Sequence, residues 1–218
     1  FFIDIWGVIH NGINLNSKAV NVLDNLTNEN KEFVLLTNAP RPNITVIDFL
    51  KKIGLKNYHK NVFTSGEAAL KYLIKELKNK KFFHIGPSRD FNLFKNFKNL
   101  RVLNIEEADY LLCSGLFDEH ENDVNYYKKL FKNHTLKKMI CTNPDLVVER
   151  GNKRELCAGS VAKYFEEISG EEIRIKLPEV PPYDVMPNVP GLTQAQAKRI
   201  GLETHLADGP TRPLHLIN

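Results

Sequence analysis

Three polar side chains that together suit nucleophilic catalysis lie at the ends of two apolar segments. The 218-residue chain begins FFIDIWGVIHNG, in which Asp4 follows an apolar run, and a second run, FVLLTN, ends in Thr37 and Asn38. If both runs are parallel strands, their carboxyl ends meet at the sheet edge where ligands bind. There a carboxylate can act as a nucleophile, while a hydroxyl and an amide donate hydrogen bonds to a negatively charged oxygen.

Each of these residues also has an ordinary structural explanation. Asp4 could cap a helix or close a turn, and Thr37 and Asn38 could bond to their own backbone in a turn. Gly7 and the HNG sequence that follows predict a flexible turn whose backbone N–H groups can approach an anion. Because the polar residues follow two strands together, a binding or catalytic site is favoured over separate turns.

Short apolar runs alternate with amphipathic stretches along the first 170 residues. Gly54 suits the left-handed position after a helix, and Thr64 or Ser65, with Glu67, suits a helix start. Strands separated by helices predict the α/β fold class, with a mostly parallel sheet covered on both faces. Periodicity predicts strands at 1–6, 33–38, 81–86, 108–115 and 138–143, and helices at 19–26, 43–54, 64–77, 122–131 and 158–170.

Composition and charge exclude several classes of protein. The net charge of +4 is too balanced to indicate a nucleic-acid partner. No apolar run reaches the ~20 residues of a membrane helix. Cys113, Cys141 and Cys157 form no C-x-x-C pair and predict a reduced, cytoplasmic location. Because the chain begins at Phe1, inside a predicted strand and without methionine, we expect further residues to precede it.

The composition changes near Gly170. The 48 residues that follow hold seven of the 11 prolines and both glutamines, whereas the chain before them is rich in lysine and asparagine. Proline at this density does not continue a regular strand and helix pattern. A proline-rich surface segment, a poorly determined sequence and a chimera or frame error all fit this atypical tail, residues 171–218.

Several of these segments resemble one family in order along the chain. FFIDIWGVIHNG resembles the first motif of the haloacid dehalogenase-like hydrolases, a strand that ends in the nucleophilic aspartate. FVLLTNAP resembles their second motif, and its Thr-Asn pair is typical of the class IIA, nitrophenylphosphatase-like branch. VFTSGEAALKYL, ADYLLCSGL and ICTNPDLVVERGNKRELCAGSVAKYFEEISG also resemble that branch. The resemblance covers about residues 1–170 and implies a Rossmann-like core with a large inserted α/β cap.

The resemblance also implies a division into domains. The core would comprise residues 1–62 and 159–218, and the cap residues 63–158. An insert of this size closes over a core site and excludes water. TNPD ends a predicted cap strand, so Asn143 and Asp145 are candidates to line the cavity, with a capping turn as the equal alternative.

In the phosphatases of this family, the aspartate of the first motif attacks phosphorus, and an aspartate two residues later exchanges protons with the leaving group and water. The resemblance gives Asp4 the first of these roles. The resemblance implies Mg²⁺ held by Asp4, the backbone carbonyl of residue 6 and an acidic residue of the last motif, for which HLADGPTR offers Asp208. IRIKLP resembles the segment with the charge-balancing lysine and offers Lys176. Residue 6 is Trp6, whose indole N–H is only a donor and cannot serve as that acid. Losing a general acid typically costs ~10²–10⁴-fold in rate.

Three interpretations therefore stay open. The first is a phosphatase in which His10 or a cap residue transfers the proton, or whose substrate has a good leaving group; the alternative for His10 is an ordinary turn histidine. The second is a dehalogenase-like hydrolase, in which halide leaves without a proton. The third is a degenerate hydrolase scaffold that only binds ligand.

The ordered motifs favour the first of these interpretations. We expect a Mg²⁺-dependent hydrolase of a small phosphate monoester, with Asp4, Thr37, Asn38 and Lys176 as catalytic residues. We expect a small phosphorylated substrate as the partner, no nucleic acid, no membrane, and a possible homodimer.

Overall fold

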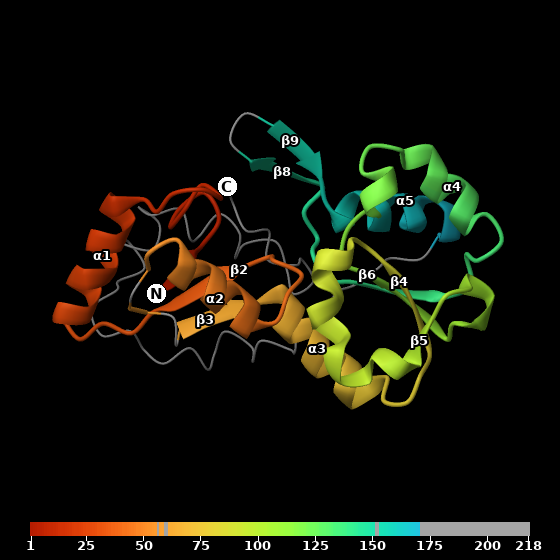
Figure 1. The fold of residues 1–218 in the computed structure, drawn as a ribbon, viewed down its shortest axis with the longest axis horizontal. Coiled ribbons are helices and arrows are strands. Elements are labelled where there is room, and N and C mark those ends of the chain that lie inside the picture. Colours follow the sequence, from red (N-terminus) through yellow and green to blue (C-terminus); the bar gives the residue numbers. More distant parts are fainter. Residues whose placement is uncertain (56, 59–60, 151–152, 171–218) are drawn as a thin grey trace, which may run out of the picture. The chain divides into compact units, whose positions relative to one another are not determined.

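The computed structural model describes residues 1–55, 57–58, 61–150 and 153–170 of the chain. These residues belong to one compact unit and form two parallel sheets and one antiparallel hairpin (Figure 1). None of the helices described is long and apolar enough to cross a membrane.

The predicted strands and helices occur in their predicted order, and the structure adds four strands that were not predicted, as well as 3₁₀ segments (η). The elements are β1 (Phe2–Asp4), α1 (Ser17–Asn28), β2 (Val34–Thr37), α2 (Asn43–Lys52), β3 (Val62–Thr64), α3 (Ser65–Glu76), β4 (Phe82–Ile85), η2 (Ser88–Leu100), β5 (Arg101–Val102), η3 (Ile105–Glu107), β6 (Tyr110–Cys113), η4 (Asp118–His120), α4 (Val124–Phe131), β7 (Lys138–Cys141), β8 (Val147–Arg150), β9 (Lys153–Leu156) and α5 (Ala158–Ser169). The four added strands are β3, β5, β8 and β9.

The first sheet has the order β1-β2-β3, and all of its strand pairs are parallel. Asp4 pairs with Leu36, and Thr37 pairs with Thr64, so the three strands end at the same level. A core of buried aliphatic and aromatic side chains from β2, β3, α1, α2 and the turn after β1 packs around this sheet. Its members include Ile5, Ile9, Leu23, Phe33, Leu35, Val46, Leu50, Leu55 and Val62.

The second sheet has the order β5-β4-β6-β7 and is also parallel. Alternate residues of β6 belong to two different cores: Tyr110 and Leu112 pack with α3 and η2, whereas Leu111 and Cys113 pack with α4 and α5. Strands covered on both faces in this way read as continuous apolar runs, as YLLC does. The predicted α/β fold class, with helices on both faces of a parallel sheet, is confirmed.

Two predicted helix ends are also confirmed. Thr64 is the N-cap of α3, and its hydroxyl accepts the backbone N–H of Glu67. Gly54 follows α2 with a φ of +103°, the left-handed region that suits glycine. These local signals were readable because each depends on only a few neighbouring residues.

The predicted division into a core and a cap stays a prediction. The predicted boundary between residues 62 and 63 falls inside β3, which pairs with β2 in the first sheet. The predicted boundary between residues 158 and 159 falls at the start of α5, which packs Val161, Ala162 and Phe165 on the second sheet. Residues 171–218, which would complete the core, lie outside the described residues.

Candidate active site

Asp4 is held at the carboxyl end of β1 by the turn that follows it. Ile5 and Ile9 are buried in the core of the first sheet, and the Ile9 N–H donates to the Ile5 carbonyl in one helical turn. The Asp4 side chain is half-buried, and its Oδ1 accepts the backbone N–H of Ile5 at 2.8 Å. The carboxylate is therefore fixed at the strand end and is not a helix cap.

Thr37 and Asn38 end the neighbouring strand, as the sequence predicts. Thr37 Oγ1 accepts the Ala39 N–H at 3.2 Å, which is the turn contact expected as its alternative role. The Thr37 hydroxyl hydrogen stays available to donate. Asn38 Nδ2 donates to Asp145 Oδ1 at 3.0 Å, across 107 residues of sequence. The structure thus brings together the ends of β1 and β2 and the loop after β7.

The loop after β7 presents Asp145 and uses Asn143 to shape its turn. Asn143 Oδ1 accepts the Asp145 backbone N–H at 2.9 Å, so Asn143 makes the turn contact that was its alternative role. Gly159 at the start of α5 lies against this loop: a Cβ there would sit 2.1 Å from the Pro144 carbonyl oxygen. Only glycine lets the helix and the loop approach so closely.

The Asp145 charge acts on the Asp4 carboxylate in this arrangement. Burial raises the pKa of Asp4 from its ordinary value and the Asp145 charge raises it further, against hydrogen bonds from the Ile5 and Trp6 backbone that lower it. Burial also raises the pKa of Asp145, and the hydrogen bond from Asn38 lowers it. Among the residues that the structure describes, neither carboxylate forms an ion pair. The site would accordingly gain from a bound cation.

Replacing Asp145 should lower the pKa of Asp4 in the metal-free protein. Asp145→Asn removes the like charge and leaves burial unchanged, so the Asp4 carboxylate should persist to a lower pH than in the wild type. A carbon-13 NMR titration of the Asp4 carboxyl measures this shift. Asp48→Asn, at an exposed position, makes the same charge change as a control. An Asp4 titration that responds equally to both variants would contradict the placement of Asp145.

Trp6 contacts the hairpin of β8 and β9. Its Nε1 donates to the Glu149 carbonyl at 3.1 Å, and its ring meets the His10 ring edge-on with centroids 5.2 Å apart. The position that carries the family's acid is therefore used for packing and for one long-range hydrogen bond.

His10 has the features of an ordinary turn histidine. It is buried, its Nδ1 accepts the Gly12 N–H at 2.8 Å, and its ring packs against Phe49. Burial lowers the pKa of His10, so the imidazole stays neutral near pH 7. The contacts favour this role over proton transfer at Asp4.

Comparison with known proteins finds one family and several solved structures that are similar to this chain. Residues 1–98 match the haloacid dehalogenase-like hydrolase family. A haloacid dehalogenase-like hydrolase from Brucella suis 1330 has a similar structure, with a TM-score of 0.68 and 28% identity over 77% of this chain and 64% of that chain. The first 98 residues are thus similar to the haloacid dehalogenase-like hydrolases, and the chain shares its fold with a protein of that family. No curated protein matches this chain.

Two phosphatases share the fold of this chain at lower identity. A 4-nitrophenylphosphatase from Thermotoga maritima gives a TM-score of 0.60 with 22% identity, over 79% of this chain and 65% of that chain. A glycerol phosphate phosphatase from Mycobacterium tuberculosis in complex with magnesium gives 0.57 with 19% identity, over 79% and 52%. This chain thus spans between about half and two thirds of the length of these relatives. The likeness to these two phosphatases is one of fold.

The residues present fit Mg²⁺ as part of a coordination set. Mg²⁺ prefers oxygen ligands and often takes only one or two protein carboxylates, with waters and substrate phosphate completing its shell. Asp4 supplies such a carboxylate, beside a second one. No cluster of three His, Cys, Asp or Glu residues in the described part of the chain could hold a metal by itself. The predicted ligand Asp208 and the predicted charge-balancing Lys176 lie outside the described residues, and the Trp6 carbonyl stays a predicted ligand.

Sequence reasoning missed the contacts that link distant segments. The hairpin of β8 and β9 had a readable signal, because VVERGNKREL places a Gly-Asn dipeptide between two short strands. Arg41, which forms an ion pair with the buried Asp90, had no such signal. An arginine in a loop gives no indication of a carboxylate 49 residues away.

Proposed function

We propose that this hydrolase is a Mg²⁺-dependent phosphatase that cleaves a small phosphate monoester through a phosphorylated Asp4. The observation that carries the proposal is the parallel register of β1 and β2, in which Asp4 pairs with Leu36. That register supports a single site for the Asp4 carboxylate and the Thr37 and Asn38 side chains. The likeness in fold to two phosphatases adds to this support.

The first chemical step forms a bond from an Asp4 carboxylate oxygen to phosphorus. The bond from phosphorus to the ester oxygen breaks, and that oxygen leaves with the electron pair. The Thr37 hydroxyl and the Asn38 amide donate hydrogen bonds to the phosphate oxygens, where charge is concentrated. Asn38 Nδ2 carries two hydrogens, so it can donate to Asp145 and to phosphate at once.

The second step returns Asp4 to its starting state. The oxygen of a water molecule attacks phosphorus, the bond to the Asp4 oxygen breaks, and inorganic phosphate leaves. Bound Mg²⁺ would offset the negative charge shared by the carboxylate and the phosphate. Lys176 is proposed to help in the same way. Because Trp6 cannot protonate the leaving oxygen, substrates whose leaving group is stable as an anion should react fastest.

Hydrolysis of p-nitrophenyl phosphate tests this proposal directly. We expect the purified protein to release nitrophenol with Mg²⁺ and to lose this activity in excess EDTA, with recovery when Mg²⁺ is restored. The absence of turnover under all of these conditions would contradict the proposal and favour a ligand-binding role.

One observation favours a second candidate, a dehalogenase-like hydrolase. The Trp6 indole N–H donates to the Glu149 carbonyl and gives Asp4 no acid partner, which suits a leaving group that needs no proton. In that reaction an Asp4 oxygen would attack carbon and displace halide, and water would then hydrolyse the ester. Halide release from 2-haloacids without added metal, measured alongside the phosphatase assay, would establish this candidate instead.

A further inference from the structure

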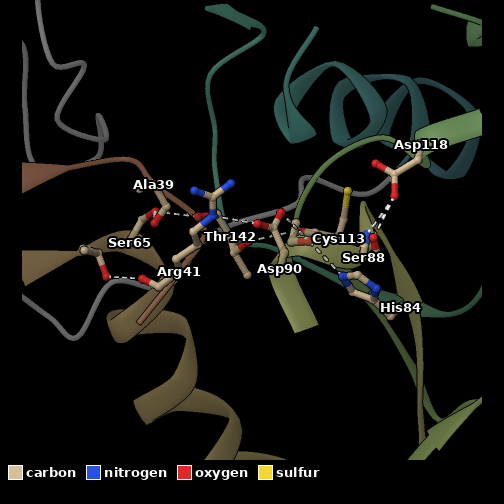
Figure 2. Close-up of polar contacts among 11 residues, drawn as sticks. Ala39, Arg41, Ser65, His84, Ser88, Asp90, Cys113, Asp118 and Thr142 are labelled. Atoms are coloured by element: carbon tan, nitrogen blue, oxygen red, sulfur yellow. Dashed lines mark hydrogen bonds and ion pairs between the residues drawn. The ribbon is translucent and has the colours of Figure 1, made fainter. Parts of the chain in front are cut away.

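The loop between β2 and α2, residues 38–42, carries Asn38 at one end and a charged anchor at the other. Arg41 Nε donates to Asp90 Oδ1 at 2.8 Å, and Figure 2 shows this pair at the centre of a chain of polar contacts. The Asp90 side chain is 2% exposed and the Arg41 side chain 32% exposed. A buried carboxylate without a partner lowers the stability of the fold, so the contact with Asp90 holds Arg41 in place.

The other carboxylate oxygen of Asp90 is also fixed. Ser114 Oγ donates to Asp90 Oδ2 at 3.2 Å, and His84 Nε2 lies 2.8 Å from Ser114 Oγ. Since the one Ser114 hydrogen points to Asp90, His84 must donate from Nε2. Its buried Nδ1 is then an unprotonated acceptor with no hydrogen-bond partner among the residues that the structure describes. Gly86 makes room for this chain, because a Cβ there would lie 2.3 Å from Ser114 Oγ.

These three side chains do not form a catalytic triad. In a triad the carboxylate bonds the histidine, but here Asp90 bonds the serine. Burial, with a contribution from Arg101, lowers the pKa of His84 to about 3, so it is a poor base near pH 7. The chain therefore serves to hold Asp90 in place.

The backbone of the same loop is fastened to the start of α3. Thr64 Oγ1 donates to the Arg41 carbonyl at 2.5 Å, and the Gly66 N–H donates to the Ala39 carbonyl at 3.1 Å. A Cβ on Gly66 would lie 2.2 Å from the Arg41 nitrogen, so the two backbones are in direct contact. The loop consequently has little freedom between Ala39 and Arg41.

The loop after β7 is also joined to the start of α3 by a hydrogen bond. Ser65 Oγ lies 2.5 Å from the Thr142 carbonyl oxygen and 3.2 Å from that of Ala39, so one hydroxyl joins the two loops (Figure 2). Thr142 precedes the segment that ends in Asp145, the acceptor of Asn38. The position of Asn38 relative to Asp145 thus depends on how the 38–42 loop is held.

We propose that Arg41 is a positioning residue whose ion pair with Asp90 holds the 38–42 loop so that Asn38 reaches Asp145 and the phosphate. The proposal rests on the phosphatase function for its effect on turnover, but its effect on Asn38 does not. Misplacing a catalytic group by ~1 Å can cost ~10²-fold in rate, so one loop anchor can matter for the reaction.

The test compares three variants with the wild type. Arg41→Gln removes the charge, Arg41→Lys keeps it, and Asp90→Asn removes the acceptor charge while keeping the side chain's shape. Lys75→Gln, which breaks the exposed pair with Glu76, is the matched control. Each variant is first checked for a folded circular dichroism spectrum at the assay temperature. Two readouts follow: kcat and KM for p-nitrophenyl phosphate, and the side-chain NH₂ signal of Asn38 in nitrogen-15 NMR, assigned by its loss in Asn38→Asp.

We expect Arg41→Gln and Asp90→Asn to lower kcat/KM by about 10- to 100-fold and to move the Asn38 signal. Arg41→Lys should stay within about threefold of the wild type, since a lysine ammonium also carries charge and donor hydrogens for Asp90. If the wild type shows no turnover, the phosphatase proposal fails, and the Asn38 signal alone decides the positioning role. Folded Arg41→Gln protein with a lower melting temperature but an unchanged Asn38 signal would overturn the inference. Equal losses in the Gln and Lys variants would overturn it too, because the charge would then be irrelevant.

Discussion

Asp4→Asn should abolish the hydrolysis of p-nitrophenyl phosphate, with a fall in kcat of at least about 1,000-fold. An amide has nearly the shape of the carboxylate but does not attack phosphorus. The Asp4→Asn protein should fold normally, because burial raises the pKa of Asp4 and a neutral side chain avoids the cost of burying a charge. The assay is initial-rate kinetics at saturating substrate and Mg²⁺.

The matched control for Asp4→Asn is Asp48→Asn, which makes the same chemical change at an exposed position of α2. Its kinetics should equal those of the wild type. Substantial turnover by Asp4→Asn, with a normal circular dichroism spectrum, would show that the nucleophile lies elsewhere. Halide release that also disappears in Asp4→Asn would keep Asp4 as the nucleophile but change the substrate.

Trp6→Asp should increase kcat for alkyl phosphates by about 100-fold relative to Trp6→Asn. Both variants lose the hydrogen bond from Trp6 Nε1 to the Glu149 carbonyl and the contact with His10, so their structural losses match. Only the aspartate can exchange a proton, which typically contributes ~10²–10⁴-fold. The comparison between these two variants therefore isolates the missing general acid.

The effect of Trp6→Asp should depend on the leaving group. Nitrophenolate is a stable anion and needs little protonation, so the ratio of the two variants should be small for p-nitrophenyl phosphate. An alkoxide needs a proton, so the ratio should be large for an alkyl phosphate. Equal rates for the Asp and Asn variants on both substrates would mean that another group already transfers the proton, or that Trp6 is placed too far from the leaving oxygen.

The sequence was a good guide to what local patterns control. The runs that end in Asp4 and Asn38 are adjacent parallel strands, and the capping role of Thr64 and the turn at Gly54 follow from side-chain and backbone preferences. The Asp4 and Thr37 strand ends meet because parallel strands share an edge, which is a general property of the fold. These features needed no knowledge of distant contacts.

Contacts between distant segments decided the rest. Trp6 donates a hydrogen bond to the Glu149 carbonyl 143 residues away, and Arg41 donates to Asp90 49 residues away. The sequence around Trp6 and Arg41 does not indicate either partner. The sheet that α5 covers was not predictable for the same reason: an apolar stripe does not specify which sheet it packs on, and the structure places Val161, Ala162 and Phe165 against the second sheet. Lys176 and Asp208 stay predictions, since they lie outside the described residues.

The most direct test of the account is to look for phosphate on Asp4 itself. The protein is mixed with p-nitrophenyl phosphate and Mg²⁺, quenched in acid within a turnover, and digested for mass spectrometry. We predict a phosphorylated peptide with the modification at Asp4, absent from Asp4→Asn and from samples with EDTA. A phosphorylated residue other than Asp4, or turnover with no phosphorylated peptide at any quench time, would contradict the account.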